Sequence, residues 1–189
     1  MNDVEELNED GYAALDLATK GNHLEAMKLL LSRSSPDIES VRTMAIKTSL
    51  HMAAKRGLVD AIKILVEAGA NVNKQGYTSR GASIVPLFAA TIEGQLEAMK
   101  YLLENGANME APDVVTSETA LSESCILLLP RSVRLLLEHG AKANDINLLT
   151  GETPLMCAAK VGSTEICQLL VTLGRADVHL RSSDGLSAF

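Results

Sequence analysis

A seven-residue stretch of this sequence recurs at nearly constant spacing along most of the chain. Residues 48–54, Thr-Ser-Leu-His-Met-Ala-Ala, return with substitutions at 85–91 and 153–159, in shorter form at 119–121, and more weakly from residue 13. The copies begin 35, 37, 34 and 34 residues apart. A period of about 20 to 50 residues is typical of arrays in which one small unit stacks on the next. The sequence therefore predicts a quasi-linear array without a single central core.

Each copy is predicted to begin with a short helix and a turn. Threonine caps a helix, and proline fits directly after it because the first helical N–H has no partner. Nine residues after the start stands a residue type that tolerates a left-handed backbone and so ends the helix. These residues are Asn22, Gly57, Gly94 and Gly162.

The fourth copy departs from this pattern because Leu128 occupies the turn position. A left-handed leucine costs about 1 kcal/mol or more, so we expect a different turn here, with the next helix starting at Pro130. Two interpretations of the apolar segment 125–129 stay open. It is either a repacked turn covered by neighbouring loops or an apolar spot offered to a partner.

The second helix of each copy is predicted from apolar residues at positions i, i+3 and i+4, which share one helical face. The sets are Met27, Leu30 and Leu31; Ile62, Leu65 and Val66; Met99, Leu102 and Leu103; Val133, Leu136 and Leu137; and Cys167, Leu170 and Val171. One unit cannot cover this face by itself, so neighbouring units must stack. Close helix layers are built from leucine and alanine, which explains why aromatic residues make up only 3% of the chain.

These copies resemble the ankyrin repeat. The family pattern Gly-x-Thr-Pro-Leu-x-x-Ala-Ala-x-x-Gly runs from Gly151 to Gly162, and Gly-Ala-Asn-Val-Asn follows a second helix at 69–73. The resemblance implies an all-α, ankyrin-type repeat solenoid, in which helix-turn-helix pairs alternate with β-hairpin-like loops, or fingers. It does not identify the ligand, because such arrays are scaffolds for many unrelated partners.

The predicted domain organisation follows from the copies. Residues 1–9 form an acidic leader and residues 10–189 form the array. Its repeats are expected at about 10–44, 45–81, 82–115, 116–149 and 150–183, and residues 184–189 match the opening of a truncated sixth. Because a solenoid needs a terminal repeat with a polar outer face, we expect the array to be the amino-terminal part of a longer protein or to have been trimmed.

Three extra residues lie in the segment 74–81, which the resemblance assigns to a finger. Tyr77 and Arg80 lie on it, and both residue types are enriched at binding hot spots. A finger that reaches a ligand and a tolerated surface insertion both fit the sequence.

The resemblance implies that a partner binds the concave inner face, which is lined by the fingers and by the exposed end of each first helix. The candidate partner-binding residues are Lys47, Lys55, Arg56, Tyr77, Arg80, Ile84, Ile92, Glu93, Glu118, Ile126, Leu127, Lys160 and Val161. They change from basic in the early repeats to apolar in the third and fourth. A peptide with acidic residues at one end and an apolar anchor in the middle would complement them. The alternative is a set of ordinary solvated residues.

No pattern for catalysis, metal binding or cofactor binding is found, since HExxH, GxGxxG, GxxxxGK[ST] and GxSxG segments are absent. His51 holds the histidine place of the ankyrin motif, where a hydrogen bond within the turn network is expected. Cys125 and Cys167 are expected in the core and Cys157 at a partly exposed position. We therefore predict a protein that is not an enzyme and that has no catalytic residues, no metal and no cofactor.

Charge and cysteine content narrow the class of protein. The chain has 24 acidic and 17 basic residues and a net charge of −7, which disfavours nucleic acid as a partner. Three cysteines without a CxxC pair do not form a disulfide framework, and no apolar run approaches the roughly 18 residues that span a bilayer. We expect a monomer of the reducing cytoplasm or nucleus, without a membrane segment.

The predicted function is a non-catalytic protein-protein interaction scaffold that binds a protein or peptide. One alternative is the recruiting domain of a larger enzyme or effector whose catalytic part lies beyond residue 189. Another is a spacer with no specific ligand.

Overall fold

Ten helices and one two-stranded hairpin make up the part of the chain that this computed structural model describes, residues 14–33, 49–77 and 83–188. The helices are α1 (Ala14–Lys20), α2 (Leu24–Arg33), α3 (Ser49–Arg56), α4 (Val59–Glu67), α5 (Pro86–Ile92), α6 (Leu96–Glu104), α7 (Ala120–Ile126), α8 (Pro130–Glu138), α9 (Pro154–Lys160) and α10 (Thr164–Thr172). Strands β1 (Gly76–Tyr77) and β2 (Ser83–Ile84) pair antiparallel. The predicted all-α fold of helix pairs with hairpin-like loops is confirmed.

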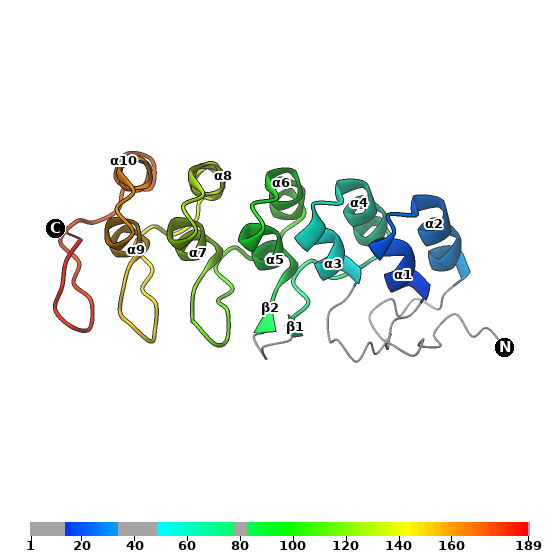
Figure 1. Cartoon of the computed structure of the whole chain (residues 1–189), viewed down its shortest axis with the longest axis horizontal. Helices are drawn as coiled ribbons and strands as arrows, with labels where there is room; N and C mark the ends of the chain where they lie inside the picture. Colours follow the sequence, from blue (N-terminus) through cyan, green and yellow to red (C-terminus); the bar gives the residue numbers. More distant parts are fainter. Residues whose placement is uncertain (1–13, 34–48, 78–82, 189) are drawn as a thin grey trace. The chain divides into compact units, whose positions relative to one another are not determined.

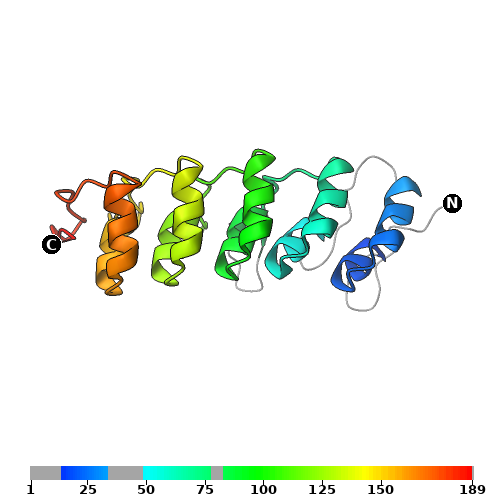
Figure 2. The same cartoon turned by 90° about the horizontal axis from the view of Figure 1, so that it is seen from above.

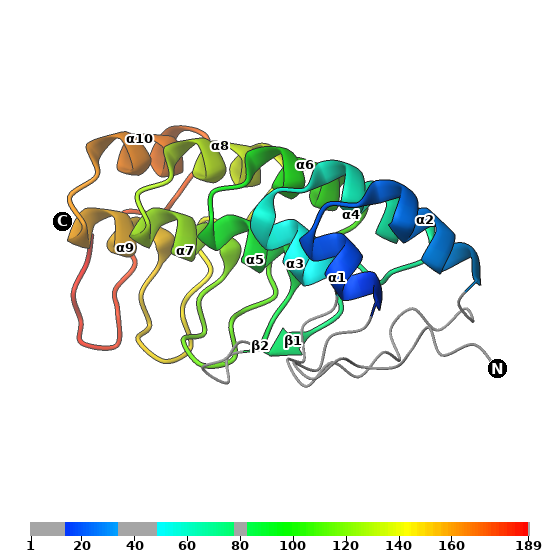
Figure 3. The same cartoon turned by 45° about the vertical axis from the view of Figure 1, so that its right-hand side comes forward.

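The helices form two layers within each of two compact units, of which the first ends at Ala107 and the second begins at Asn108. In the first unit α1, α3 and α5 form one layer, and α2, α4 and α6 form the other (Figure 1). In the second unit α7 packs on α9, and α8 on α10 (Figure 2). The long loops of the second unit extend from the α7 and α9 layer, away from α8 and α10 (Figure 3).

The cores of both units are aliphatic, as the scarcity of aromatic residues predicts. The largest fully buried side chains are Met27, Leu50, Ile62, Leu65, Leu87, Met99, Leu102, Leu121, Leu136, Leu155, Ile166 and Leu170. Buried alanines, among them Ala53, Ala54, Ala90 and Ala158, let the first helices approach their neighbours closely. Each buried leucine contributes about 2 kcal/mol, so stacking supplies the stability that one short helix pair lacks.

Two of the first helices begin at the expected threonine caps. Thr119 Oγ1 accepts a hydrogen bond from the Ser122 N–H at 3.4 Å, and Thr153 Oγ1 accepts one from the Met156 N–H at 3.3 Å. Proline occupies the first helical turn at Pro86, Pro130 and Pro154. Local sequence therefore sets these helix starts directly.

The expectation of a different turn at Leu128 is wrong. Leu128 has a φ of 57°, in the left-handed region that is also occupied at Asn22, Gly57, Gly94 and Gly162. The Leu129 N–H donates to the Ser124 carbonyl at 2.9 Å and folds the chain back toward α8, which begins at Pro130 as expected. Because stacking requires the same helix-pair geometry in each copy, Leu128 adopts the turn at a cost of about 1 to 2 kcal/mol.

Helix α10 buries a different stripe from the one expected. The buried residues are Ile166, Leu169 and Leu170, whereas Cys167 is half-buried and Val171 is exposed. The buried stripe faces α8 and α9, on which α10 packs. Cys167 and Val171 instead line an open pocket of about 260 Å³ with Leu155 and Ala188. The placement of Cys167 in the core is therefore only partly correct.

Candidate functional site

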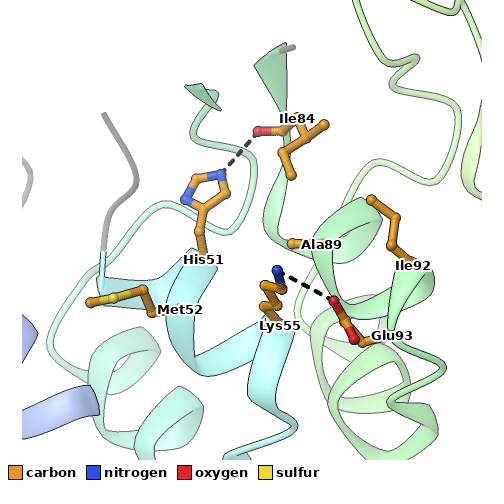
Figure 4. Close-up of a pocket in the computed structure, with 7 residues that line it drawn as sticks. All are labelled: His51, Met52, Lys55, Ile84, Ala89, Ile92 and Glu93. Atoms are coloured by element: carbon orange, nitrogen blue, oxygen red, sulfur yellow. Dashed lines mark hydrogen bonds and ion pairs between the residues drawn. The ribbon is translucent and has the colours of Figure 1, made fainter. Parts of the chain in front are cut away.

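Four candidate partner-binding residues come together at one pocket of the first unit. The pocket measures about 110 Å³ and lies between α3, β2 and α5 (Figure 4). It is lined by His51, Met52, Lys55, Ile84, Ala89, Ile92 and Glu93. A cavity of about 150 Å³ in another protein binds benzene, so a pocket of this size accommodates roughly one side chain of a partner.

His51 forms one wall of the pocket and joins two elements. Its Nε2 lies 2.9 Å from the carbonyl oxygen of Ile84, in a buried hydrogen bond between α3 and β2. This bond confirms the structural role expected for the histidine. The Ile84 side chain is itself buried, so it forms part of the pocket wall and not an exposed contact.

Lys55 and Glu93 form the polar rim of the same pocket. Lys55 Nζ lies 3.3 Å from Glu93 Oε1, and both side chains are about half exposed (Figure 4). An exposed ion pair contributes only about 0 to 1 kcal/mol, so either charge can turn to a ligand at little cost. With Ile92 also exposed, the pocket offers an apolar site beside an ion pair.

Arg56 lies one residue further along α3, where its guanidinium donates a hydrogen bond to the Lys20 carbonyl at the end of α1. A cation at a helix C-terminus also interacts favourably with the helix dipole. Arg56 is therefore exposed to solvent, and its side chain also links the end of α3 to the end of α1.

In the second unit, the candidates at the end of α7 are exposed. Ile126, Leu127 and Leu128 are each more than a third exposed, so the described residues do not cover this turn. At the end of α9, Val161 is exposed and Lys160 Nζ lies 3.1 Å from Glu152 Oε1. The hydrogen bond to Glu152 and its charge raise the pKa of Lys160.

Glu118 is a buried residue of its finger and is not exposed on the surface. It is 8% exposed, and its Oε1 accepts a hydrogen bond from Asn147 Nδ2 at 2.5 Å. Its Oε2 has no hydrogen-bond partner. A direct partner contact of Glu118 would thus require the finger to open.

The tips of two fingers carry exposed residues that the sequence argument missed. Val114 and Val115 occupy one tip and Leu148 and Leu149 the next, and all four side chains are more than half exposed. A signal was present in the sequence, because Asp-Val-Val-Thr-Ser-Glu-Thr at 113–119 is matched by Asn-Leu-Leu-Thr-Gly-Glu-Thr at 147–153. The candidate finger residues lie directly before the start of each copy. The tip lies about four residues earlier in the sequence, so its residues are not among the candidates.

The thiols are buried or half-buried. The expectation of a partly exposed Cys157 is wrong, because Cys157 is buried between neighbouring helices and burial raises its pKa to about 12. Burial also raises the pKa of Cys125 and, less strongly, of Cys167. Across the described ranges, no three His, Cys, Asp or Glu side chains are arranged to hold a metal ion. No helix in that part of the chain is long and apolar enough to cross a membrane.

Several sequence predictions lie outside the described residues. They are the acidic leader 1–9, Lys47, Arg80 and the side chain of Tyr77, whose backbone pairs with Ser83.

Family models match most of the chain. A model of three ankyrin repeats matches residues 35–113 and again 87–184, and a model of a single ankyrin repeat matches residues 10–41. The crystal structure of the ankyrin repeat domain of Bcl-3, described as a unique member of the IkappaB protein family, superimposes with a TM-score of 0.82 at 27% identity. The match covers 95% of this chain and 79% of that one.

Curated relatives are longer than this chain. The B-cell lymphoma 3 protein homolog of Mus musculus is 26% identical over 188 residues, which cover 96% of this chain and 41% of the relative. The E3 ubiquitin-protein ligase XBAT32 of Arabidopsis thaliana is 30% identical over 195 residues, which cover 89% of this chain and 37% of the relative. The chain thus spans about two fifths of the length of these relatives.

Proposed function

The chain belongs to the ankyrin-repeat family, and on that basis we propose that it is a non-catalytic scaffold that binds a protein or peptide along its first-helix ends and fingers. The pocket between α3, β2 and α5 is the observation that carries this proposal. Residues from three elements converge there, and its apolar walls and charged rim fit an apolar anchor side chain of a partner.

The first unit offers charged contacts to a partner. Lys55, Arg56 and Glu93 lie at the ends of α3 and α5, next to the exposed Ile92. In the second unit, Ile126, Leu127 and Val161 offer apolar contacts at the equivalent helix ends. A preorganised surface of this kind binds without the cost of ordering a loop.

The test is selection of binding peptides from a random library displayed on phage, with the 189-residue chain as target. The affinities of the selected peptides are then measured for three variants. Lys55→Glu with Arg56→Glu alters the charged rim, and Ile126→Asp places a carboxylate at the apolar end of α7. The matched control is Lys63→Glu with Lys100→Glu, which reverses two exposed charges on the second-helix layer.

We expect the first two variants to weaken binding by about tenfold or more and the control to leave it unchanged. If neither face variant changes the affinity of any selected peptide, the proposed face is wrong. If the control weakens binding equally, the peptides respond to overall charge alone.

We further propose a monomer of the cytoplasm or nucleus that does not bind nucleic acid. The net charge of −7 supports the last point. All three cysteines are free, as expected in a reducing compartment.

A second candidate function is the recruiting part of a larger enzyme. The similarity to the ubiquitin ligase XBAT32 favours it, since 89% of this chain aligns with 37% of that protein. Sequencing the transcript tests this idea. A reading frame that continues into a catalytic domain would support it, and a reading frame confined to residues 1–189 would exclude it.

A further inference from the structure

The two fingers of the second unit with apolar tips have the same construction. In each, the side chain of the first residue accepts two backbone N–H groups of the tip. Asp113 Oδ1 accepts from Val115 at 2.6 Å and from Thr116 at 3.1 Å, and Asn147 Oδ1 accepts from Leu149 at 2.8 Å and from Thr150 at 3.2 Å. Backbone bonds of 2.8 Å from Asp113 to Glu118 and from Asn147 to Glu152 close the stems. The tips are therefore held in defined turns.

The apolar residues at these tips are not needed for the turn. Val114, Val115, Leu148 and Leu149 contribute only backbone groups to the bonds that shape it, and Leu148 is 82% exposed. The finger at 181–187 carries the polar pair Ser182 and Ser183 at the equivalent positions, and a backbone bond of 2.8 Å from the Ser182 N–H to the Leu186 carbonyl closes it. A finger can therefore close with polar residues at its tip. The fold of the loop does not require the apolar pairs Val114–Val115 and Leu148–Leu149.

The two fingers are fixed side by side. Asn147 Nδ2 donates to the Thr116 carbonyl at 2.8 Å as well as to Glu118. The two loops project together from the layer of α7 and α9 (Figure 3). Two apolar pairs therefore lie on neighbouring tips, which is the arrangement needed to contact one partner segment at several points.

A groove of about 260 Å³ opens between the fingers. We call it the finger groove; Glu110, Pro112, Ser117, Thr119, Asp145, Ile146 and Leu148 line it. Lys142 contacts both carboxylates, since its backbone N–H donates to Glu110 Oε1 at 3.0 Å and its Nζ lies 3.9 Å from Asp145 Oδ2. Burial raises the pKa of Glu110, with a smaller opposing effect of the Lys142 N–H. A cation from a partner would stabilise this partly desolvated carboxylate.

The charge of the fingers indicates what kind of partner fits. Segments 108–119 and 142–153 contain five acidic residues and one basic residue, Lys142. One of the acidic residues is the buried Glu118, whose Oε2 lacks a partner. An acidic peptide and a second copy of this chain would both bring like charges together, which disfavours them.

We propose that the finger tips and the finger groove bind a partner segment in which apolar side chains alternate with lysine or arginine. The apolar side chains contact the Val114–Val115 and Leu148–Leu149 tips, and the cation enters the groove beside Glu110 and Asp145. This inference rests on the proposed scaffold function and names a partner class for one part of the surface.

The test uses three fluorescein-labelled peptides of equal length as probes, with alternating Leu and Lys, Leu and Glu, or Ser and Lys. Fluorescence anisotropy measures their binding to the 189-residue chain. We expect the Leu/Lys peptide to bind about tenfold or more tightly than either other peptide. Its affinity should fall when salt is raised from about 0.1 to about 0.5 M, because the Debye length shortens.

Two variants separate the two parts of the site. The serine variant (Val114→Ser, Val115→Ser, Leu148→Ser and Leu149→Ser) removes the apolar tips without changing charge, and we expect about tenfold weaker Leu/Lys binding. Glu110→Gln with Asp145→Asn should reduce both the affinity and its salt dependence. The matched control is Leu186→Ser, which removes an exposed leucine from the finger at 181–187 and should have no effect on Leu/Lys binding. Circular dichroism checks that each variant is folded.

Equal Leu/Lys binding by the wild type and the serine variant, or equal binding of the Leu/Glu peptide, would overturn this inference. The scaffold function would then still stand if phage-selected peptides lose affinity in the Lys55 and Arg56 variant. If no selected peptide responds to either set of variants, the scaffold function itself fails.

Discussion

The side-chain amide of Asn147 donates a hydrogen bond of 2.5 Å to the buried carboxylate of Glu118, and so connects two consecutive fingers. Asn147 also donates to the Thr116 carbonyl and accepts from the backbone of its own finger. One side chain thus sets both the shape of its finger and the position of that finger relative to its neighbour.

Asn147→Ala should therefore destabilise the protein strongly. The change leaves the buried carboxylate of Glu118 without its amide donor, and a buried polar group left unpaired costs about 1 to 3 kcal/mol, or more when it is charged. It also removes the hydrogen bond to the carbonyl of the exposed Thr116. We expect a loss of about 3 kcal/mol in urea unfolding. Asn144→Ala is the control, because Asn144 makes similar bonds in an exposed loop. Equal losses in the two variants would contradict a special role for Asn147.

Leu128→Gly should stabilise the protein. The left-handed backbone at this position strains a leucine but not a glycine, and the exposed side chain loses little packing. We expect a gain of about 1 kcal/mol in the free energy of unfolding. Leu127→Gly is the matched control, since Leu127 has a φ of −81° and should lose stability. A loss in both variants would show that side-chain packing outweighs backbone strain at this turn.

Gly151→Ala should disrupt the contact between the second and third fingers of the second unit. Gly151 has a φ of 69°, and a Cβ atom there would lie 2.6 Å from the Ser183 backbone nitrogen. Gly162 has a similar φ of 78° with nothing within 4 Å of its Cβ position, so Gly162→Ala measures the backbone strain alone. We expect Gly151→Ala to lose about 1 kcal/mol more and to speed amide exchange at Ser183. Equal effects of the two changes would argue against the close contact.

The buried thiol of Cys157 should make stability fall in alkaline solution. Burial raises its pKa from 9.0 to about 12, so the folded state holds its proton more tightly than the unfolded state. This contribution is complete below about pH 9 and is lost as the pH rises toward 12. Cys157→Ala should show a shallower decline in unfolding free energy over that range. Identical pH profiles of the two proteins would contradict the assignment.

Lys55→Ala should leave stability almost unchanged. Its ion pair with Glu93 is about half exposed, and such pairs contribute about 0 to 1 kcal/mol. We expect a change of less than about 0.5 kcal/mol in thermal unfolding, so that any loss of peptide binding reports on the surface. A larger destabilisation would mean that Lys55 supports the contact of α3 with α5.

The sequence located the pocket of the first unit better than the finger tips of the second. Lys55, Ile92 and Glu93 were identified because the end of each first helix has a fixed place in the copy. Glu118 is predicted to be exposed because it is the finger residue directly before the start of a copy, yet it is buried, and Asn147 of the next finger donates a hydrogen bond to it. The exposure of Val114 and Leu148 likewise depends on how two fingers lie together.

Local order along the chain decided the two helices in each copy, their threonine and proline starts and the left-handed turns at Asn22, Gly57, Gly94 and Gly162. These features depend on residues within about ten positions of one another, where periodicity and capping act directly. Tertiary structure decided the burial of Cys157 and Glu118, the stripe that α10 buries and the strained turn at Leu128. In each case the environment of a residue is set by a neighbouring repeat more than 20 residues away, and stacking of whole units outweighs local preference.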